Sequence, residues 1–273
     1  MTQRQRHIEN MGPGASIAVT GMGIVSSIGN NVKDFSESLR MGRSGIGFLK
    51  TKTDPPISIA IGAEIAGFSF EALLREYETG GLAGDMIRKA RIGAGRSPLG
   101  VQAAVIVAIE AWKSARLHDV PLNPDRVGVI VGGSNLTQDY TSGLYPKFQQ
   151  SPEYLNPRYP LHYLDTDHVG TLSEIFQIRG EGFTVGGASA SGNTAIIKGC
   201  QSIRSGIADI CLVVGALADL SPLELQGYYN LGAMGGKKFR DQPQKACRPF
   251  DREHEGFIYG QASACLVLES MDS

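Results

Sequence analysis

Ser189 is the residue whose type and position most clearly suggest chemistry. It lies within residues 185–194 (VGGASASGNT), where a strand pattern ends and a long helical pattern begins. A hydroxyl at such a turn lies near the positive end of a helix, where an anion or a nucleophile is favoured. A serine hydroxyl does not ionise near neutral pH, so it needs an adjacent base to attack a carbonyl. The chemistry therefore depends on which groups accompany Ser189.

One scheme uses only residues that this chain contains. Ser189, then Asp209 or Asp219, then His254 follows the Ser–Asp–His order of α/β-hydrolases. The nucleophile elbow G-x-S-x-G would require glycine at position 191, which is a serine. A serine hydrolase is therefore one alternative, based on residue order with an imperfect elbow.

The other histidines suggest structural roles. His162 and His168 flank Asp165 and Asp167 just before a helical pattern, which predicts an N-cap and a surface position. His254 lies in the charged turn 251–255, where we expect it to be solvated. None of these histidines is an obvious base for Ser189.

Apolar runs alternate with helical patterns along the chain. The strand-like runs, which are apolar at every position as in strands buried on both faces, are 17–19, 127–131, 210–214 and 264–268. The helical patterns are 32–40, 99–115 and 191–207, the last ending near Gly206. This rhythm predicts an α/β layered fold. We expect one domain over 1–273, with residues 1–15 flexible.

Two stretches interrupt this alternation. Residues 50–96 are mixed and carry a basic cluster: Arg88, Lys89, Arg91 and Arg96. Residues 132–164 form a long connection rich in tyrosine: Tyr140, Tyr145, Tyr154, Tyr159 and Tyr163. Long connections are often functional, and tyrosine is enriched at interfaces. The connection is therefore either an interface or substrate lining, or a packed excursion over the core.

Composition excludes several classes of protein. The chain has 273 residues with 26 basic and 27 acidic side chains, so bulk charge gives no reason to expect binding to nucleic acid or an anionic membrane. No apolar run is long enough to span a membrane, and the polar N-terminus lacks a signal-peptide core. We therefore expect a cytoplasmic protein. The four cysteines lack metal-site spacing, which favours buried free thiols and no bound metal.

Four segments, taken in order, resemble the β-ketoacyl synthase (condensing-enzyme) family. They are 17–30 (IAVTGMGIVSSIGN), 41–46 (MGRSGI), the strand in 126–133, and 248–251 (RPFD) with 255–257 (EGF) and 266–269 (LVLE), which is similar to a family hairpin. The resemblance implies a thiolase-like layered α-β-α-β-α fold. This chain would supply only its N-terminal half.

The chain departs from the family pattern at the nucleophile. Family members usually read T-A-C-[ST]-S-G where this chain reads GASASG at 187–192, so Ser189 replaces cysteine. A cysteine at a helix N-terminus forms a thiolate and accepts an acyl group, whereas serine does not. Decarboxylation of a malonyl thioester needs only a polarised thioester carbonyl, because loss of CO2 leaves an enolate. The chain resembles Cys-to-Ser members that convert malonyl- to acetyl-acyl carrier protein in polyketide β-branching cassettes.

The resemblance also implies partners. The family's two histidines and lysine lie in H-G-T-G-T and N-x-x-x-G-H segments, which this sequence lacks. A further chain or half would supply them, and we expect a dimer of such units. Alone, the chain would be inactive and would leave an apolar face uncovered. The alternative from another class is a non-catalytic subunit resembling a chain-length factor, in which Ser189 is inert.

Further site residues follow from the same resemblance. Asn135 and Tyr228 would line the acyl tunnel, with Tyr228 limiting its depth, although an ordinary core position is also open for Tyr228. The basic cluster Arg88, Lys89, Arg91 and Arg96 would contact an acidic acyl carrier protein through charge steering. No cofactor would bind directly, because the carrier's phosphopantetheine arm would deliver the substrate.

Overall fold

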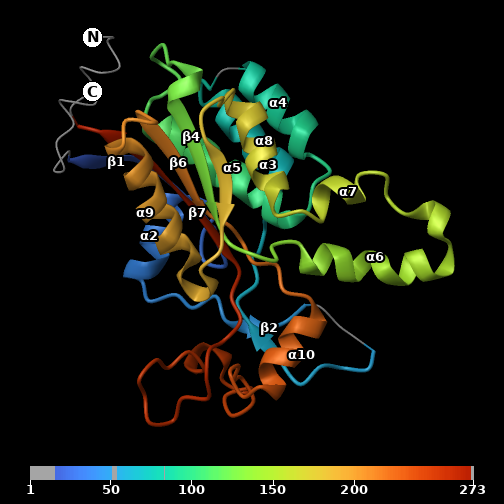
Figure 1. Cartoon of the computed structure of the whole chain (residues 1–273). Helices are drawn as coiled ribbons and strands as arrows, with labels where there is room; N and C mark the ends of the chain where they lie inside the picture. Colours follow the sequence, from blue (N-terminus) through green and yellow to red (C-terminus); the bar gives the residue numbers. More distant parts are fainter. Residues whose placement is uncertain (1–15, 51–53, 83, 272–273) are drawn as a thin grey trace.

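The structure is a computed structural model that describes residues 16–50, 54–82 and 84–271, so the expected flexibility of residues 1–15 lies outside the described residues (Figure 1). Within the described part, five strands form one sheet in the order β1-β7-β6-β4-β5. They are β1 (Ile17–Ser26), β4 (Val127–Gly132), β5 (Gly182–Val185), β6 (Ile210–Gly215) and β7 (Ala262–Ser270). β4 pairs in parallel with β5 and β6, whereas β7 is antiparallel to β6 and β1. All four predicted apolar runs lie in strands, which confirms the α/β prediction.

The helices follow the predicted patterns where these were clear. They are α2 (Val32–Arg40), α3 (Phe70–Thr79), α4 (Gly84–Ala94), α5 (Leu99–Ser114), α6 (Gln138–Gln150), α7 (Tyr159–His162), α8 (Thr166–Phe176), α9 (Ser191–Arg204) and α10 (Pro222–Asn230). A small sheet pairs β2 (Gly47–Phe48) with β3 (Ile61–Gly62). α2 has the predicted bounds, and α9 ends before Gly206, whose φ of +70° is the left-handed conformation typical of a helix end.

Helices cover both faces of the main sheet (Figure 1). On one face α5 packs against β1, β6 and β7, and α3, α4 and α8 pack around α5. On the other face α9 packs against β4 and β6. α5 is buried along most of its length because it lies between the sheet and the outer helices. The result is a helix–sheet–helix arrangement of layers.

The contact between β1 and α5 depends on two glycines of the first sequence motif. A Cβ atom at Gly21 would lie 2.1 Å from the Ala111 carbonyl oxygen, and one at Gly23 would lie 2.0 Å from that of Val107. Either distance is well inside van der Waals contact. The two glycines therefore let the strand and the helix approach closely enough to form the main core.

The face of the sheet that carries α9 is only partly covered. β4 and β6 are buried, as predicted for strands covered on both faces. On β1, in contrast, Val19 is 52% exposed and Met22 is 49% exposed. Ile197 and Ile207, on α9 and just after it, are also exposed. These side chains confirm the prediction that the chain leaves apolar surface uncovered.

The connection 132–164 differs from the prediction. It is largely helical, with α6 and α7, and α6 has no buried residue and extends from the rest of the structure (Figure 1). The prediction of a packed excursion over the core is therefore wrong for α6. Gly143, Pro146 and the lack of an apolar period concealed this helix in the sequence. An interfacial role for its tyrosines stays a prediction.

The segment 248–269 also differs from the expected hairpin. β7 pairs with β1 and β6, whereas residues 248–257 belong to an irregular loop. This loop joins the fold through an isolated bridge between Phe257 and Met234. Among the described residues, no helix combines the length and apolar character needed to cross a membrane.

Candidate functional site

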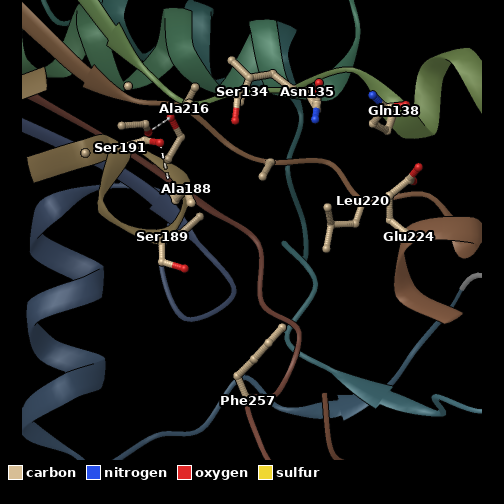
Figure 2. Close-up of a pocket in the computed structure, with 18 of the residues that line it drawn as sticks. Ser134, Asn135, Gln138, Ala188, Ser189, Ser191, Ala216, Leu220, Glu224 and Phe257 are labelled. Carbon is tan, nitrogen blue, oxygen red and sulfur yellow. Dashed lines mark hydrogen bonds between the residues drawn. The ribbon is translucent and has the colours of Figure 1, made fainter. Parts of the chain in front are cut away.

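A cavity lined by described residues lies at the carboxyl ends of β4, β5 and β6. Its volume is about 690 Å³, and segments that follow these three strands line it, starting at Gly132, Ala188 and Gly215. Residues of α10 and the stretch before β7 complete the described walls. The carboxyl ends of parallel strands meet at one edge of a sheet, which is where α/β proteins place their ligands. Ser189 is among the lining residues (Figure 2).

The turn that carries Ser189 is held by its neighbours. It is a short 3-10 helix, η3 (Ala188–Ala190), directly before α9. The Gly187 N–H donates to Ser191 Oγ at 2.9 Å. The Ser191 hydroxyl donates to the Ala188 carbonyl at 2.8 Å (Figure 2). Ala188 has φ of +48°, in the left-handed region. Three residues other than Ser189 thus determine the shape of the turn.

Ser189 itself is exposed at the start of the 14-residue helix α9. No hydrogen bond with a described residue involves its hydroxyl or its N–H. N–H groups at a helix start lack intrahelical partners and carry partial positive charge. The N–H groups of Ala190 and Ser191 donate to the Gly187 and Ala188 carbonyls, so the Ser189 N–H is the one available to a carbonyl oxygen in the cavity. None of the described lining residues is a histidine, lysine or arginine, so the described walls offer Ser189 no imidazole or amine base and no cation.

The structure brings the two other predicted site residues to the same cavity. Asn135 and Tyr228 both line it together with Ser189. Asn135 is held by its N–H, which donates to Asp165 Oδ2 at 2.8 Å. Tyr228 is 40% exposed and packs edge-on against Phe257, so an ordinary core position is wrong for it. Their contact with substrate stays a prediction.

The basic cluster of α4 is not part of this cavity. Arg88 and Lys89 both form ion pairs with Asp85, and Arg91 pairs with Glu71 and Glu78. Arg96 is the member of the cluster without an ion pair among the described residues. Contact of this cluster with a carrier protein stays a prediction. Within the cluster, Arg96 has the positive charge that is most available to a partner.

The predicted surface position of His162 and His168 is wrong. Both are buried, because α8 packs against α4 and α5 and the short helix α7 precedes it. His162 Nδ1 lies 2.8 Å from an Asp167 carboxylate oxygen. His168 lies against Gly100 of α5, and its burial lowers the pKa of the imidazole.

Asp165 occupies the N-cap position of α8, as predicted, but its side chain does not cap this helix. Its carboxylate makes no capping hydrogen bond to α8 and accepts the N–H groups of Asn135 and Leu136, each at 2.8 Å. Asp165 thus holds the segment after β4 that lines the cavity. His254 is exposed as predicted, with Nδ1 2.7 Å from the Asp251 carbonyl oxygen.

The hydrolase arrangement is not assembled. Asp209 precedes β6, at the end of the sheet opposite the cavity, and its carboxylate pairs with Arg126. Asp219 accepts a hydrogen bond from Gln261 Nε2 at 3.1 Å and lies beside a separate small cavity. His254 is bound within its own loop. The hydrolase alternative is therefore wrong, because these side chains do not converge on Ser189.

Asp219 gives a prediction about stability. It is 9% exposed, and burial together with the nearby Asp139 carboxylate raises its pKa from the usual 3.8 to about 6. The folded protein therefore binds a proton more tightly than the unfolded chain. The contribution of Asp219 to the stability of the folded protein is fully present below about pH 4 and is lost as pH rises through about 6. The difference in pKa corresponds to about 3 kcal/mol.

We therefore expect Asp219→Asn to stabilise the protein at pH 7.5 by up to about 3 kcal/mol and to have little effect near pH 4. Urea unfolding at both pH values measures this difference. Asp241→Asn, at an exposed loop position, is the matched control. Equal effects of Asp219→Asn at the two pH values would contradict the assignment.

The cysteines do not supply the missing nucleophile. All four are free thiols, as predicted, and none of them lines the cavity. Cys211 and Cys265 are buried, whereas the predicted burial is wrong for the half-buried Cys200 and the exposed Cys247. Burial raises the pKa of Cys211 to about 12. Among the described residues, no group of three or more histidine, cysteine or acidic side chains is arranged to hold a metal ion.

Sequence reasoning missed several lining residues. Ser134, Gln138, Glu224 and Phe257 all reach the cavity. Gln138 and Glu224 come from α6 and α10, far apart in the sequence, so only the folded arrangement brings them together. Ser191 was part of the quoted motif, but its role in holding the turn depends on backbone geometry that its spacing does not reveal.

Comparison with known proteins adds to this geometry. A family model described as "Beta-ketoacyl synthase, N-terminal domain" matches residues 15–273. The chain is 38% identical over 257 residues to the polyketide biosynthesis malonyl-ACP decarboxylase PksF of Bacillus subtilis (strain 168), covering 94% of this chain and 58% of PksF. It is 26% identical over 257 residues to 3-oxoacyl-(acyl-carrier-protein) synthase 2 of Coxiella burnetii, covering 94% of this chain and 58% of that protein.

Solved structures show the same fold. A β-ketoacyl synthase from Burkholderia phymatum STM815 matches with a TM-score of 0.75 and 21% identity, over 95% of this chain and 60% of the other. The ishigamide ketosynthase/chain length factor matches with a TM-score of 0.75 and 24% identity, over 94% of this chain and 59% of the other. The fold is therefore the thiolase-like ketosynthase fold, and the chain spans less than two thirds of these relatives.

Proposed function

Because the chain belongs to the β-ketoacyl synthase family, we propose that it is the N-terminal part of a decarboxylase that converts malonyl- to acetyl-acyl carrier protein in polyketide biosynthesis. The observation that carries the proposal is Ser189, a serine at the family's cysteine position, in a cavity whose described walls hold no histidine or lysine. The 38% identity to PksF, described as a malonyl-ACP decarboxylase, supports the same reaction.

The proposed chemistry uses the start of α9. The thioester carbonyl oxygen would accept a hydrogen bond from the Ser189 N–H, and the Ser189 hydroxyl would donate a second one. The bond between the malonyl carboxyl and the methylene carbon breaks, CO2 leaves, and the electron pair forms an enolate on the thioester oxygen. Protonation of the methylene carbon then gives the acetyl thioester. No covalent bond to Ser189 is required.

The partners belong to the proposal as well. We propose that 1–273 forms one domain that works with a C-terminal ketosynthase half carrying two histidines. The exposed Val19, Met22 and Ile197 would pack against that half. The substrate would arrive on the phosphopantetheine arm of an acyl carrier protein, and the units would form a cytoplasmic dimer. One solved relative is a type II polyketide synthase carrier protein in complex with its ketosynthase.

One observation favours a second candidate. Solved relatives include complexes of a ketosynthase with its chain-length factor. A subunit of that kind would need no acyl-accepting cysteine, and the serine at position 189 would be inert. It would contribute to the cavity of a partner ketosynthase and would release no CO2 by itself.

Incubation of this chain together with the C-terminal ketosynthase half, which we call the full-length protein, with malonyl-carrier protein tests the proposal. We expect acetyl-carrier protein, detected by intact-protein mass spectrometry. Ser189→Ala should slow its formation about tenfold, because the variant loses one hydrogen bond to the enolate and keeps the backbone N–H. Ser134→Ala, in the same cavity, is the control and should leave the rate unchanged.

The alternative outcomes are distinct. Unaltered malonyl-carrier protein with the full-length protein would contradict decarboxylation. If chain extension occurred after a ketosynthase was added to that mixture, the chain-length-factor function would replace decarboxylation as the proposed function. If Ser189→Ala formed acetyl-carrier protein as fast as the unsubstituted protein, the Ser189 hydroxyl would have no role in the reaction. The proposed reaction itself would stand.

A further inference from the structure

The wall of the cavity across from Ser189 is polar. Figure 2 shows Ser134, Asn135, Gln138 and Glu224 on that side, with Gln138 at the start of α6 and Glu224 in the first turn of α10. Glu224 is the only acidic residue among the described residues that line this cavity, and no described basic residue lines it. A carboxylate without a counter-charge therefore faces the space in which an acyl group would lie.

The position of Glu224 is fixed by local structure. It is the third residue of α10 and forms a capping box with Ser221, whose N–H donates to Glu224 Oε2 at 2.9 Å and whose hydroxyl bonds to the same oxygen. A capping box satisfies N–H groups that a helix start leaves free. One carboxylate oxygen is thus held by the helix, and Oε1 makes no hydrogen bond to a described residue.

The size of the cavity does not by itself restrict the acyl group. A volume of about 690 Å³ is within the range of sites that enclose drug-sized ligands, so a medium-length acyl chain would fit. Leu220, Leu231 and Phe257 would provide apolar contacts for such a chain. Apart from the steric limit assigned to Tyr228, a restriction on the acyl group would come from the chemistry of the polar wall.

An apolar chain lying against this wall would remove water from the Glu224 carboxylate without replacing its hydrogen bonds. Desolvation of an unpaired charge is strongly unfavourable. Gln138, whose side-chain amide makes no hydrogen bond to a described residue, would lose its solvation as well. A short acyl group that ends near Ser189 leaves the polar wall hydrated.

We propose that Glu224, assisted by Gln138, is a specificity determinant that excludes medium and long apolar acyl chains, so that the site accepts only short acyl thioesters. The inference rests on the proposed function and names its substrate class. It differs from the depth limit assigned to Tyr228, because that limit is steric whereas this one is electrostatic.

The test is calorimetric binding of two unreactive thioether analogues of acyl-pantetheine, acetyl and octanoyl, to the full-length protein. We expect the unsubstituted protein to bind the octanoyl analogue no better than the acetyl analogue. Glu224→Gln removes the charge but keeps the capping box, which glutamine also forms. This variant should bind the octanoyl analogue at least about tenfold more tightly, with acetyl binding unchanged within about twofold.

Glu174→Gln, an exposed position on α8, is the matched control and should change neither affinity. An octanoyl affinity of Glu224→Gln equal to that of the unsubstituted protein overturns the inference. If Glu224→Gln does not fold, Gln138→Leu decides, because it should also favour the octanoyl analogue. The binding measurement does not require turnover. A protein that shows this selectivity but releases no CO2 would therefore contradict the proposed function and still support the role of Glu224 in excluding long acyl chains.

Discussion

Cysteine in place of Ser189 is expected to make the full-length protein accept a covalent acetyl group from acetyl-carrier protein. Position 189 is exposed in the turn before α9, where partial positive charge favours a thiolate. The thiolate would attack the thioester carbonyl, and the thiol of the carrier's phosphopantetheine arm would leave. Intact-protein mass spectrometry should show an acetyl adduct on most of the Ser189→Cys protein and none on the unsubstituted protein.

Ser134→Cys provides the matched control for this change. Ser134 is also exposed in the cavity, but it lies four residues before α6 rather than directly at a helix start. It should remain unlabelled. Equal labelling of the two variants would show that any cysteine in the cavity reacts. An unlabelled Ser189→Cys protein that still binds the carrier protein would show that the turn does not present its side chain to the thioester.

Alanine in place of Gly23 is expected to destabilise the protein by about 3 kcal/mol or more. Its Cβ would lie 2.0 Å from the Val107 carbonyl oxygen, and this neighbour is helix backbone rather than a flexible side chain. β1 and α5 would have to separate, which disturbs the main core, and overpacking of this kind is costly. Urea unfolding followed by circular dichroism measures the loss, which should leave little folded protein at 37 °C if the total stability is ordinary.

Gly170→Ala is the control for that experiment. Gly170 lies inside α8, and a Cβ atom there has no neighbour within 4 Å. Alanine is the better helix former, so this variant should be unchanged or more stable by up to about 1 kcal/mol. A Gly23→Ala protein with the stability of the unsubstituted protein would contradict the close packing of β1 on α5.

The parts of the fold that could be predicted are those with a strong local pattern. β4 and β6 are uniformly apolar because both of their faces are covered, and α5 and α9 show a clear helical period. α6 has neither signal, because it contacts the rest of the described structure so little that no apolar face is required. The buried position of His168 was equally concealed, since it depends on the packing of α8 against α4 and α5.

The candidate site could be predicted only in part. Ser189 was identified from one segment, because its neighbours in the sequence also form its turn. Asn135 and Tyr228 came from a family resemblance, and the structure places both at the cavity. Glu224 and Gln138 could not be found in this way. Both reach the cavity because the fold brings the starts of α6 and α10 to its wall, which no spacing in the sequence encodes.

The turn before α9 has a consequence for how this protein could have diverged from its relatives. Gly187, Ala188 and Ser191 maintain the turn through hydrogen bonds and one left-handed residue, and the side chain at position 189 takes no part in it. An exchange of sulfur for oxygen at that position therefore leaves the backbone as it was. Under the proposed function, one substitution at position 189 would remove acyl transfer and keep the Ser189 N–H as a donor. Such a change of reaction would require no change in the backbone of the turn.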